Sequence, residues 1–250
     1  CLALGLIRLG AAPAGRVTMD ARGDAVGGYV SSTSDVLKRV LVDQCGIPSG
    51  DIDATSFAAL ASASSAEIGL YVAEPMTRQQ AADMILASIG AWLSPTRLGK
   101  WQVGQLVAPS GAVVATFTDD DLLTVDRLAT NDPQRGVAVY RVTLDYKPFW
   151  SPLPRTETAT SLTEARRTEL SLPWRSVSST DAAVQTKHLL APEMRRAVLL
   201  NDATAAANEA ARVLALHKVR RDFVRAAVAV DTTNAAIDLG ALVTLQTNRL

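Results

Sequence analysis

The chain's two histidines and its aspartate triplet are the first groups to consider as metal ligands. His188 and His217 are the only histidines, and neither has a second histidine, a cysteine pair or an acidic partner at ligand spacing, so no zinc site is predicted. Asp119 to Asp121 offer the oxygen ligands that calcium prefers, but the spacing and central glycine of a calcium loop are absent. We therefore expect the triplet to form a turn and His217 to end a helix.

Residues for phosphate binding or nucleophilic catalysis are also missing from the sequence. Gly27-Gly28 and Gly99-Lys100 belong to neither glycine-rich nucleotide-binding pattern. The chain has no G-x-S-x-G motif, and Cys45 falls in the apolar stripe of a predicted helix, away from any histidine. A pair of carboxylates for glycoside cleavage needs only proximity in the fold, so the sequence does not exclude such a pair. No catalytic, cofactor-binding or metal-binding residue is predicted. We expect that the chain is not an enzyme and that it binds no cofactor.

Charge and composition narrow the classes of partner. Of 250 residues, 25 are lysine or arginine and 25 are aspartate or glutamate. This balance disfavours nucleic acid or an anionic membrane as the main partner. No apolar run reaches the roughly 18 residues of a membrane span, and two cysteines indicate a reducing compartment. The chain starts at Cys1 and stops in a predicted strand, as we expect of a fragment of a longer polypeptide.

Four helices are predicted from capping residues followed by apolar stripes. The best marked begins at Thr77, where the T-x-x-Q spacing to Gln80 is that of a capping box, and it ends at Gly90. The others span 33–46, 53–61 and 201–217, with Ser34, Asp53 and either Asn201 or Asp202 as N-caps.

Strands are predicted where apolar and polar residues alternate. In 136–146, Tyr140, Val142, Leu144 and Tyr146 would share one face, and Arg141, Thr143 and Asp145 the other. The remaining strand predictions are two short strands within 5–23, then 67–75, 101–108, 112–123, 169–179, 194–200, 221–230 and 240–246. A polar, proline-punctuated stretch over 151–168 is predicted to be a loop or linker.

The order of these elements predicts an α+β fold, in which a helix-strand-helix-hairpin unit is inserted between β-rich, barrel-like segments. We divide the chain into 1–30, the end of a β-rich domain; 31–128, the α+β insertion; and 129–250, a β-rich domain with one late helix that is truncated at its C-terminus.

The stretch "GAWLSPTRLGKWQVGQL" is predicted to be a corner between a helix and a hairpin. Gly90 would end the helix and Gly99 would permit the tight turn. Gly104, inside the second strand, would mark a bulge or a close backbone approach. Trp92 and Trp101 would flank the turn, within reach of each other across the hairpin and against the preceding helix.

This corner resembles a recurring stretch of phage tail hub and tail-tip proteins, in which "S-x-G-A-W" and a tight turn lead into "G-(K/R)-aromatic-x-(V/I)-G". The matching residues are Ser88, Gly90, Ala91, Trp92, Gly99, Lys100, Trp101, Val103 and Gly104. The later segments "AVVATFTDDDLL", "VAVYRVTLDY", "AARVLALHKVRRDFVRAAVAV" and "IDLGALVTLQ" follow in the family's order. The resemblance covers the chain from about Gly5 to its end.

The resemblance implies a structural virion component of a phage, prophage or gene-transfer-agent-type tail. Such hubs combine barrel-like β domains with inserted α+β pieces and close the distal end of the tail tube as a ring, typically a trimer. The implied partners are other copies of the chain, the tube or distal tail protein, and a spike or receptor-binding protein. The implied location is the virion tail, assembled in the bacterial cytoplasm.

The sequence leaves two alternative functions. A tail module that binds host-surface glycan needs aromatic platforms, for which Trp150 and Trp174 are the candidates. A tail-associated cell-wall hydrolase is less favoured, because its paired catalytic motifs are missing. Aromatic residues make up only 5% of the chain and do not alternate with basic residues, so no nucleic-acid groove is predicted.

Overall fold

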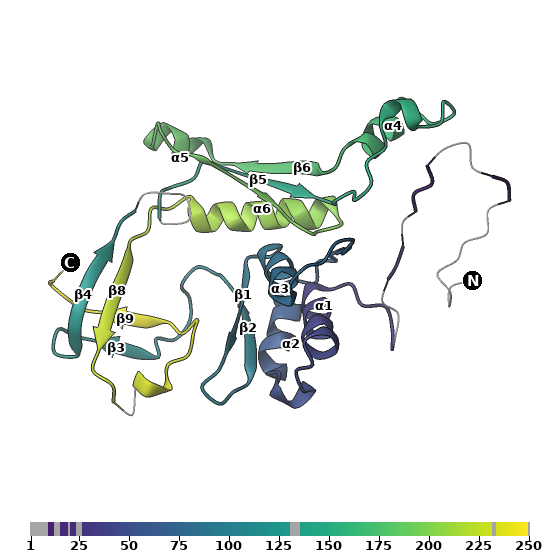
Figure 1. Cartoon of the computed structure of the whole chain (residues 1–250). Helices are drawn as coiled ribbons and strands as arrows, with labels where there is room; N and C mark the ends of the chain where they lie inside the picture. Colours follow the sequence, from purple (N-terminus) through teal and green to yellow (C-terminus); the bar gives the residue numbers. More distant parts are fainter. Residues whose placement is uncertain are drawn as a thin grey trace. The chain divides into compact units, whose positions relative to one another are not determined.

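The computed structural model describes residues 10–12, 16–19, 21–23, 27–130, 136–231 and 234–249. The chain divides into two units, and Figure 1 labels their helices and strands. The smaller unit consists of Cys1–Val30 and Phe149–Arg175, and the larger unit of Ser31–Pro148 and Ser176–Leu250. The division at residues 30/31 and 128/129 made from the sequence stays a prediction.

The smaller unit contains a 3-10 turn, η5 (Arg155–Glu157), and a helix, α4 (Glu164–Ser171). The backbone amide of Leu153 donates to the carbonyl of Leu170 (2.9 Å), which closes this segment on itself. The predicted linker over 151–168 is wrong in its second part, where α4 begins.

Charged side chains explain why this polar segment is ordered. The Arg167 guanidinium donates to the Thr158 hydroxyl (2.9 Å) and to the carbonyl of Arg155 (2.9 Å), which ties α4 to the 3-10 turn. Arg155 in turn pairs with Glu164 at the start of the helix. The strands predicted within 5–23 fall largely outside the described residues, and described residues 10–12, 16–19 and 21–23 form no strand.

The larger unit begins with three helices and a hairpin. Helix α1 (Thr33–Arg39) continues into a π-helix, η2 (Val40–Gln44), and a 3-10 turn, η3 (Ser49–Asp51), precedes α2 (Ala54–Ala63). Helix α3 (Arg78–Ala87) leads into the antiparallel strands β1 (Ala91–Pro95) and β2 (Trp101–Gln105).

The helix N-termini follow the capping signals, with one exception. Thr77 and Gln80 form the expected capping box on α3, and Asp53 accepts from the amides of Thr55 and Ser56 at the start of α2. The N-cap of α1 is Ser32 and not Ser34 as predicted. Ser34 is buried and donates to the carbonyl of Phe57 (2.9 Å), so its hydroxyl serves tertiary packing.

The second half of the larger unit packs a long helix on a mixed sheet. Strands β5 (Arg141–Tyr146), β6 (Arg175–Thr180) and β7 (Glu193–Ala197) form a sheet in the order β6-β5-β7, with β5 parallel to β7. A short helix, α5 (Ala182–Lys187), follows β6, and α6 (Ala203–His217) contacts β5 (Figure 1). Asp202 caps α6, which resolves the predicted choice between Asn201 and Asp202.

One hydrophobic core joins the helices of the first half to α6 and this sheet. Its most buried side chains, each at most 1% exposed, are Leu37, Ile85, Ile89, Val139, Val142, Leu144, Leu200, Ala206, Ala210 and Val213. The predicted polar face of β5 is confirmed, because Arg141, Thr143 and Asp145 all bond to side chains of β6.

Two further strand pairs complete the larger unit. Strand β3 (Ala115–Phe117) lies parallel to β9 (Val243–Leu245). Strand β4 (Leu122–Leu128) lies antiparallel to β8 (Phe223–Val228), with a register shift between Leu122 and Thr124. A 3-10 turn, η6 (Asn234–Ala236), precedes β9.

The α+β fold class is confirmed. Within the described residues the strands pair into small sheets of two or three strands, and none of these sheets closes into a barrel. The strand predicted over 67–75 is wrong, since only isolated bridges form there, from Glu67 to Ser32 and from Ile68 to Leu200. The chain alternates as a strand does in this segment but has no neighbouring strand with which to continue the ladder.

Candidate functional site

The corner between α3 and the hairpin uses its glycines for backbone geometry. Gly90 (φ +59°) and Gly99 (φ +78°) adopt the left-handed conformation, as expected from a helix end and a tight turn. The Gly99 amide donates to the Thr96 carbonyl (3.0 Å), and the Lys100 amide donates to the Thr96 hydroxyl (3.1 Å). These turn amides are therefore engaged within the hairpin and do not form an open anion cradle.

Gly104 has the predicted close approach, and the neighbour is Trp92. A Cβ added at Gly104 would lie 2.4 Å from Cζ2 of the Trp92 ring, so any side chain here would displace the indole. Trp92 pairs with Gly104, whereas Trp101 pairs with Pro95, three positions along the ladder. An odd offset places the two tryptophans on opposite faces of the hairpin, so the predicted contact between them is wrong.

Trp101 instead lies beside the segment that leads into α2. Its carbonyl accepts from the Asp53 amide (2.8 Å), and Ile52 pairs with Trp101 in an isolated parallel bridge. Trp101 is half-buried. The hairpin thus packs on α2 as well as on α3, the helix expected from the sequence.

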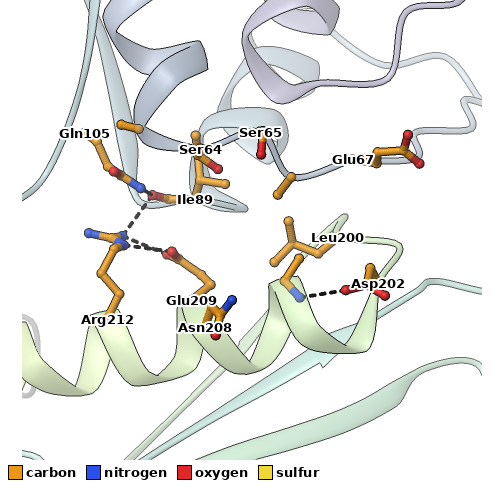
Figure 2. Close-up of a pocket in the computed structure, with 13 residues that line it drawn as sticks. Ser64, Ser65, Glu67, Ile89, Gln105, Leu200, Asp202, Asn208, Glu209 and Arg212 are labelled. Atoms are coloured by element: carbon orange, nitrogen blue, oxygen red, sulfur yellow. Dashed lines mark hydrogen bonds and ion pairs between the residues drawn. The ribbon is translucent and has the colours of Figure 1, made fainter.

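A cavity of about 430 Å³ opens in the larger unit, between the end of α2, the base of the hairpin and the first turns of α6 (Figure 2). Its inner wall includes Ile89 and Leu200, which are almost fully buried. Its rim carries exposed polar side chains, among them Ser65, Glu67 and Asn208. The cavity therefore has an apolar floor and a polar, partly acidic edge.

Arg212 of α6 holds one side of this cavity together. Its guanidinium forms a bidentate pair with Glu209 (2.7 Å for both bonds) and donates to the carbonyl of Ile89 (2.9 Å) (Figure 2). It also donates to the carbonyl of Leu106 (2.6 Å). Ile89 lies just before β1 and Leu106 just after β2, so both are at the base of the hairpin. There the Leu106 amide also donates to the carbonyl of Gly90 (2.9 Å). One side chain thus fixes the hairpin base to α6, which lies more than a hundred residues later.

Buried charge surrounds this contact. Glu209 is 8% exposed, and the pKa of the nearby Arg196 guanidinium is lowered chiefly by burial, with repulsion from Arg212 acting in the same direction and attraction to Glu209 opposing it. The Arg196 Nε is buried and has no hydrogen-bond partner among the described residues. The Glu209 carboxylate is the acid between these two cations, so its charge stabilises both.

The sequence pointed to none of these cavity residues as a site. The one usable signal was Glu209 and Arg212, an i,i+3 pair of opposite charge in an otherwise alanine-rich helix, which exposed helices commonly carry. Burial of the pair against the hairpin depends on the tertiary fold.

The residues weighed as metal ligands have structural roles in a turn and at helix ends. Asp119 accepts from Thr247, and Asp121 accepts from the amide and hydroxyl of Thr118 (both 2.8 Å), so these two acids order a turn. His188 caps the C-terminus of α5 and His217 ends α6. Among the described residues, no group of three or more histidine, cysteine, aspartate or glutamate side chains could hold a metal ion.

The remaining candidates are a thiol and two tryptophans. Cys45 is a free, half-buried thiol packed against the core. Trp150, which is 43% exposed, and Trp174, which is half-buried, both belong to the smaller unit. The residues that precede them in the chain are joined by a hydrogen bond from the Phe149 amide to the Pro173 carbonyl (2.8 Å).

Within the described part of the chain, no helix has the length and apolar character needed to cross a membrane. No protein-family model and no curated protein matches the sequence. Comparison with solved structures finds a similarity to the crystal structure of the tail protein from Neisseria meningitidis MC58, with a TM-score of 0.47 and 16% sequence identity. The match covers 86% of this chain and 56% of that protein, so this chain spans little more than half of its length.

Proposed function

We propose that the chain is a structural component of a phage or phage-like tail, at the tail hub or tip, and that it acts by protein–protein contact. The observation that carries this proposal is the corner that resembles tail hub proteins. Ser88 accepts from the Leu199 amide (2.9 Å), Gly90 and Gly99 shape the backbone, and Gly104 receives the Trp92 ring. Each of these residues shapes the corner through contacts within the chain, which supports an architectural motif over a ligand-binding loop.

Open strand edges support a role in assembly. The pairs β3–β9 and β4–β8 have two strands each, so both outer edges of each pair carry backbone groups without a neighbouring strand in the described residues. Large apolar side chains are exposed around them: Val113, Val114, Leu123, Phe223, Val230, Leu239 and Val243. Edges and apolar side chains of this kind suit contact with other protein chains.

In the proposed role the chain is non-catalytic and holds no cofactor. Its partners are other copies of itself in a ring, typically of three, and neighbouring tail proteins such as the tube protein and a spike or receptor-binding protein. It belongs to the virion tail, after assembly in the bacterial cytoplasm.

Particle composition tests this proposal directly. Purified particles from a producing strain are analysed by mass spectrometry and by immunogold labelling with an antibody against the larger unit. We expect the chain in the particles and the gold at the distal end of the tail. Particles that lack the chain, or label spread along the tube or head, would contradict the proposal.

Glycan binding by the smaller unit is the second candidate, favoured by the exposed Trp150 and by the half-buried Trp174 of the same unit. Exposed indoles can stack on sugar rings. A glycan array with the full chain and with Trp150→Ala tests it, since specific binding must disappear in the variant. An array without hits for the unmodified chain removes this candidate.

A further inference from the structure

Two adjacent leucines stand out from the larger unit in the turn after α5. Leu189 is 84% exposed and Leu190 is 96% exposed. The turn is held in place, because the His188 amide donates to the Val184 carbonyl (2.8 Å) and the Ala191 amide donates to the His188 carbonyl (2.9 Å). A single exposed leucine is ordinary on a protein surface. Two neighbouring leucines on an ordered turn form an apolar projection, which we call the leucine knob.

The cavity beside α6 has the chemistry to receive such a projection. Its accessible apolar surface comes from the small side chains of Ala63, Ala66 and Ala205, whereas Ile89 and Leu200 also line it but are almost fully buried, and its edge is polar. An apolar centre inside a polar rim is the arrangement of protein interfaces. Its volume of about 430 Å³ leaves room for two leucine side chains.

Charge is also complementary between the two surfaces. Lys187, which directly precedes the knob turn, is exposed. Glu67 and Asp202 are exposed at the cavity rim (Figure 2). Opposite charges at the rim of an apolar contact steer association and fix its orientation.

The knob cannot enter the cavity of its own chain, because the two lie at opposite ends of β5. The Tyr140 amide, just before β5, donates to the Pro192 carbonyl of the knob turn (3.3 Å). The Lys147 amide, just after β5, donates to the carbonyl of Leu200 in the cavity wall (2.7 Å). Seven residues of extended strand separate these points by about 20 Å.

We propose that the leucine knob of one copy inserts into the cavity of the next copy. The contact is head-to-tail, because knob and cavity are different surfaces, so repetition gives a closed ring or an open filament. This inference rests on the proposed function, assembly by protein contact, and names the two surfaces that meet.

A mixing experiment with two surface variants tests the contact. Leu189→Asp with Leu190→Asp removes the knob and leaves the cavity intact. Ser65→Trp obstructs the cavity mouth and leaves the knob intact; Ser65 is exposed, and its side chain forms no hydrogen bond with the residues that the structure describes. Leu98→Asp is the matched control, because Leu98 is 90% exposed at the tip of the hairpin.

Mass is measured by light scattering after size exclusion over a range of concentrations. We expect the unmodified chain and Leu98→Asp to associate alike, and each test variant to weaken association about thirtyfold or more, as loss of an interface hot spot does. Mixing the two test variants must give a 1:1 pair that grows no further, because one good knob meets one good cavity. Circular dichroism confirms that each variant is folded, and Glu67→Lys provides a second cavity variant should Ser65→Trp unfold.

Three results would overturn the proposal: an unmodified chain that stays monomeric at its highest soluble concentration, a knob variant that keeps the unmodified mass distribution, or a mixture that gives no pair. None of these results bears on the detection of the chain in purified particles. Failure of the contact and failure of the tail function are therefore distinguishable.

Discussion

Replacing Arg212 by alanine removes four hydrogen bonds at once. Glu209, only 8% exposed, loses its bidentate partner, and the carbonyls of Ile89 and Leu106 lose a donor. Breaking a buried ion pair from one side costs about 3–5 kcal/mol, because the remaining charge stays buried. The Arg212 side chain is 25% exposed and Arg196 lies close to Glu209, so we place Arg212→Ala at the lower end, about 3 kcal/mol.

The assay is a urea titration followed by circular dichroism, with Arg39→Ala as the matched control. Arg39 forms an i,i+4 pair with Asp43 in which both side chains are at least 32% exposed, so its removal costs less than about 1 kcal/mol. Replacing Arg212 and Glu209 together by methionine and leucine is expected to recover only part of the loss, because the buried carboxylate is then gone but the Arg196 guanidinium loses the acid that attracts it. Equal midpoints for Arg212→Ala and Arg39→Ala would refute the assignment of a buried, coupled pair.

Three further changes test other parts of the larger unit. Gly104→Ala forces a Cβ against Trp92 and is expected to lower stability by about 1–3 kcal/mol in a thermal melt, whereas Gly50→Ala, with open space around its Cβ position, changes little. Thr77→Ala removes the capping box of α3 and is expected to cost about 1 kcal/mol in a urea titration. The pKa of Asp145 is lowered, mainly by its hydrogen bonds from the Arg195 guanidinium in β7. Its contribution to stability is therefore complete above the unfolded pKa of about 3.9 and is lost as pH falls through the lower folded value. Asp145→Asn is expected to flatten the acid side of the stability–pH curve, and an unchanged slope would contradict this.

Local signals predicted most of the helices. Thr77, Asp53 and Asp202 each satisfy amides within three residues, so the sequence alone contains both partners of every cap. The exception at α1 shows the limit of such signals. Ser32 and Ser34 are equally good caps in sequence, and the choice between them is made by the distant carbonyl of Phe57, which binds Ser34.

Strand pairing and the cavity could not be predicted from local pattern. Val243 pairs with Ala115 and Phe223 pairs with Leu128, and nothing in either short strand identifies its partner. The tryptophans of the hairpin illustrate the same point, because the exact ladder position of Trp92 decides which face it occupies. The cavity combines α2, the hairpin base and α6, so it exists only once these elements are packed.

The bond from Arg212 to the hairpin base has a consequence for how the chain folds. Closing a loop of more than a hundred residues costs conformational entropy before the contact forms. A fold with many such contacts therefore forms slowly. During synthesis the three helices and the hairpin leave the ribosome well before α6 and β7, and their shared core waits for Leu200 and Val213. We expect the first half of the larger unit, released alone, to be collapsed but incompletely packed. The nascent chain is then exposed to aggregation until the last third has been made.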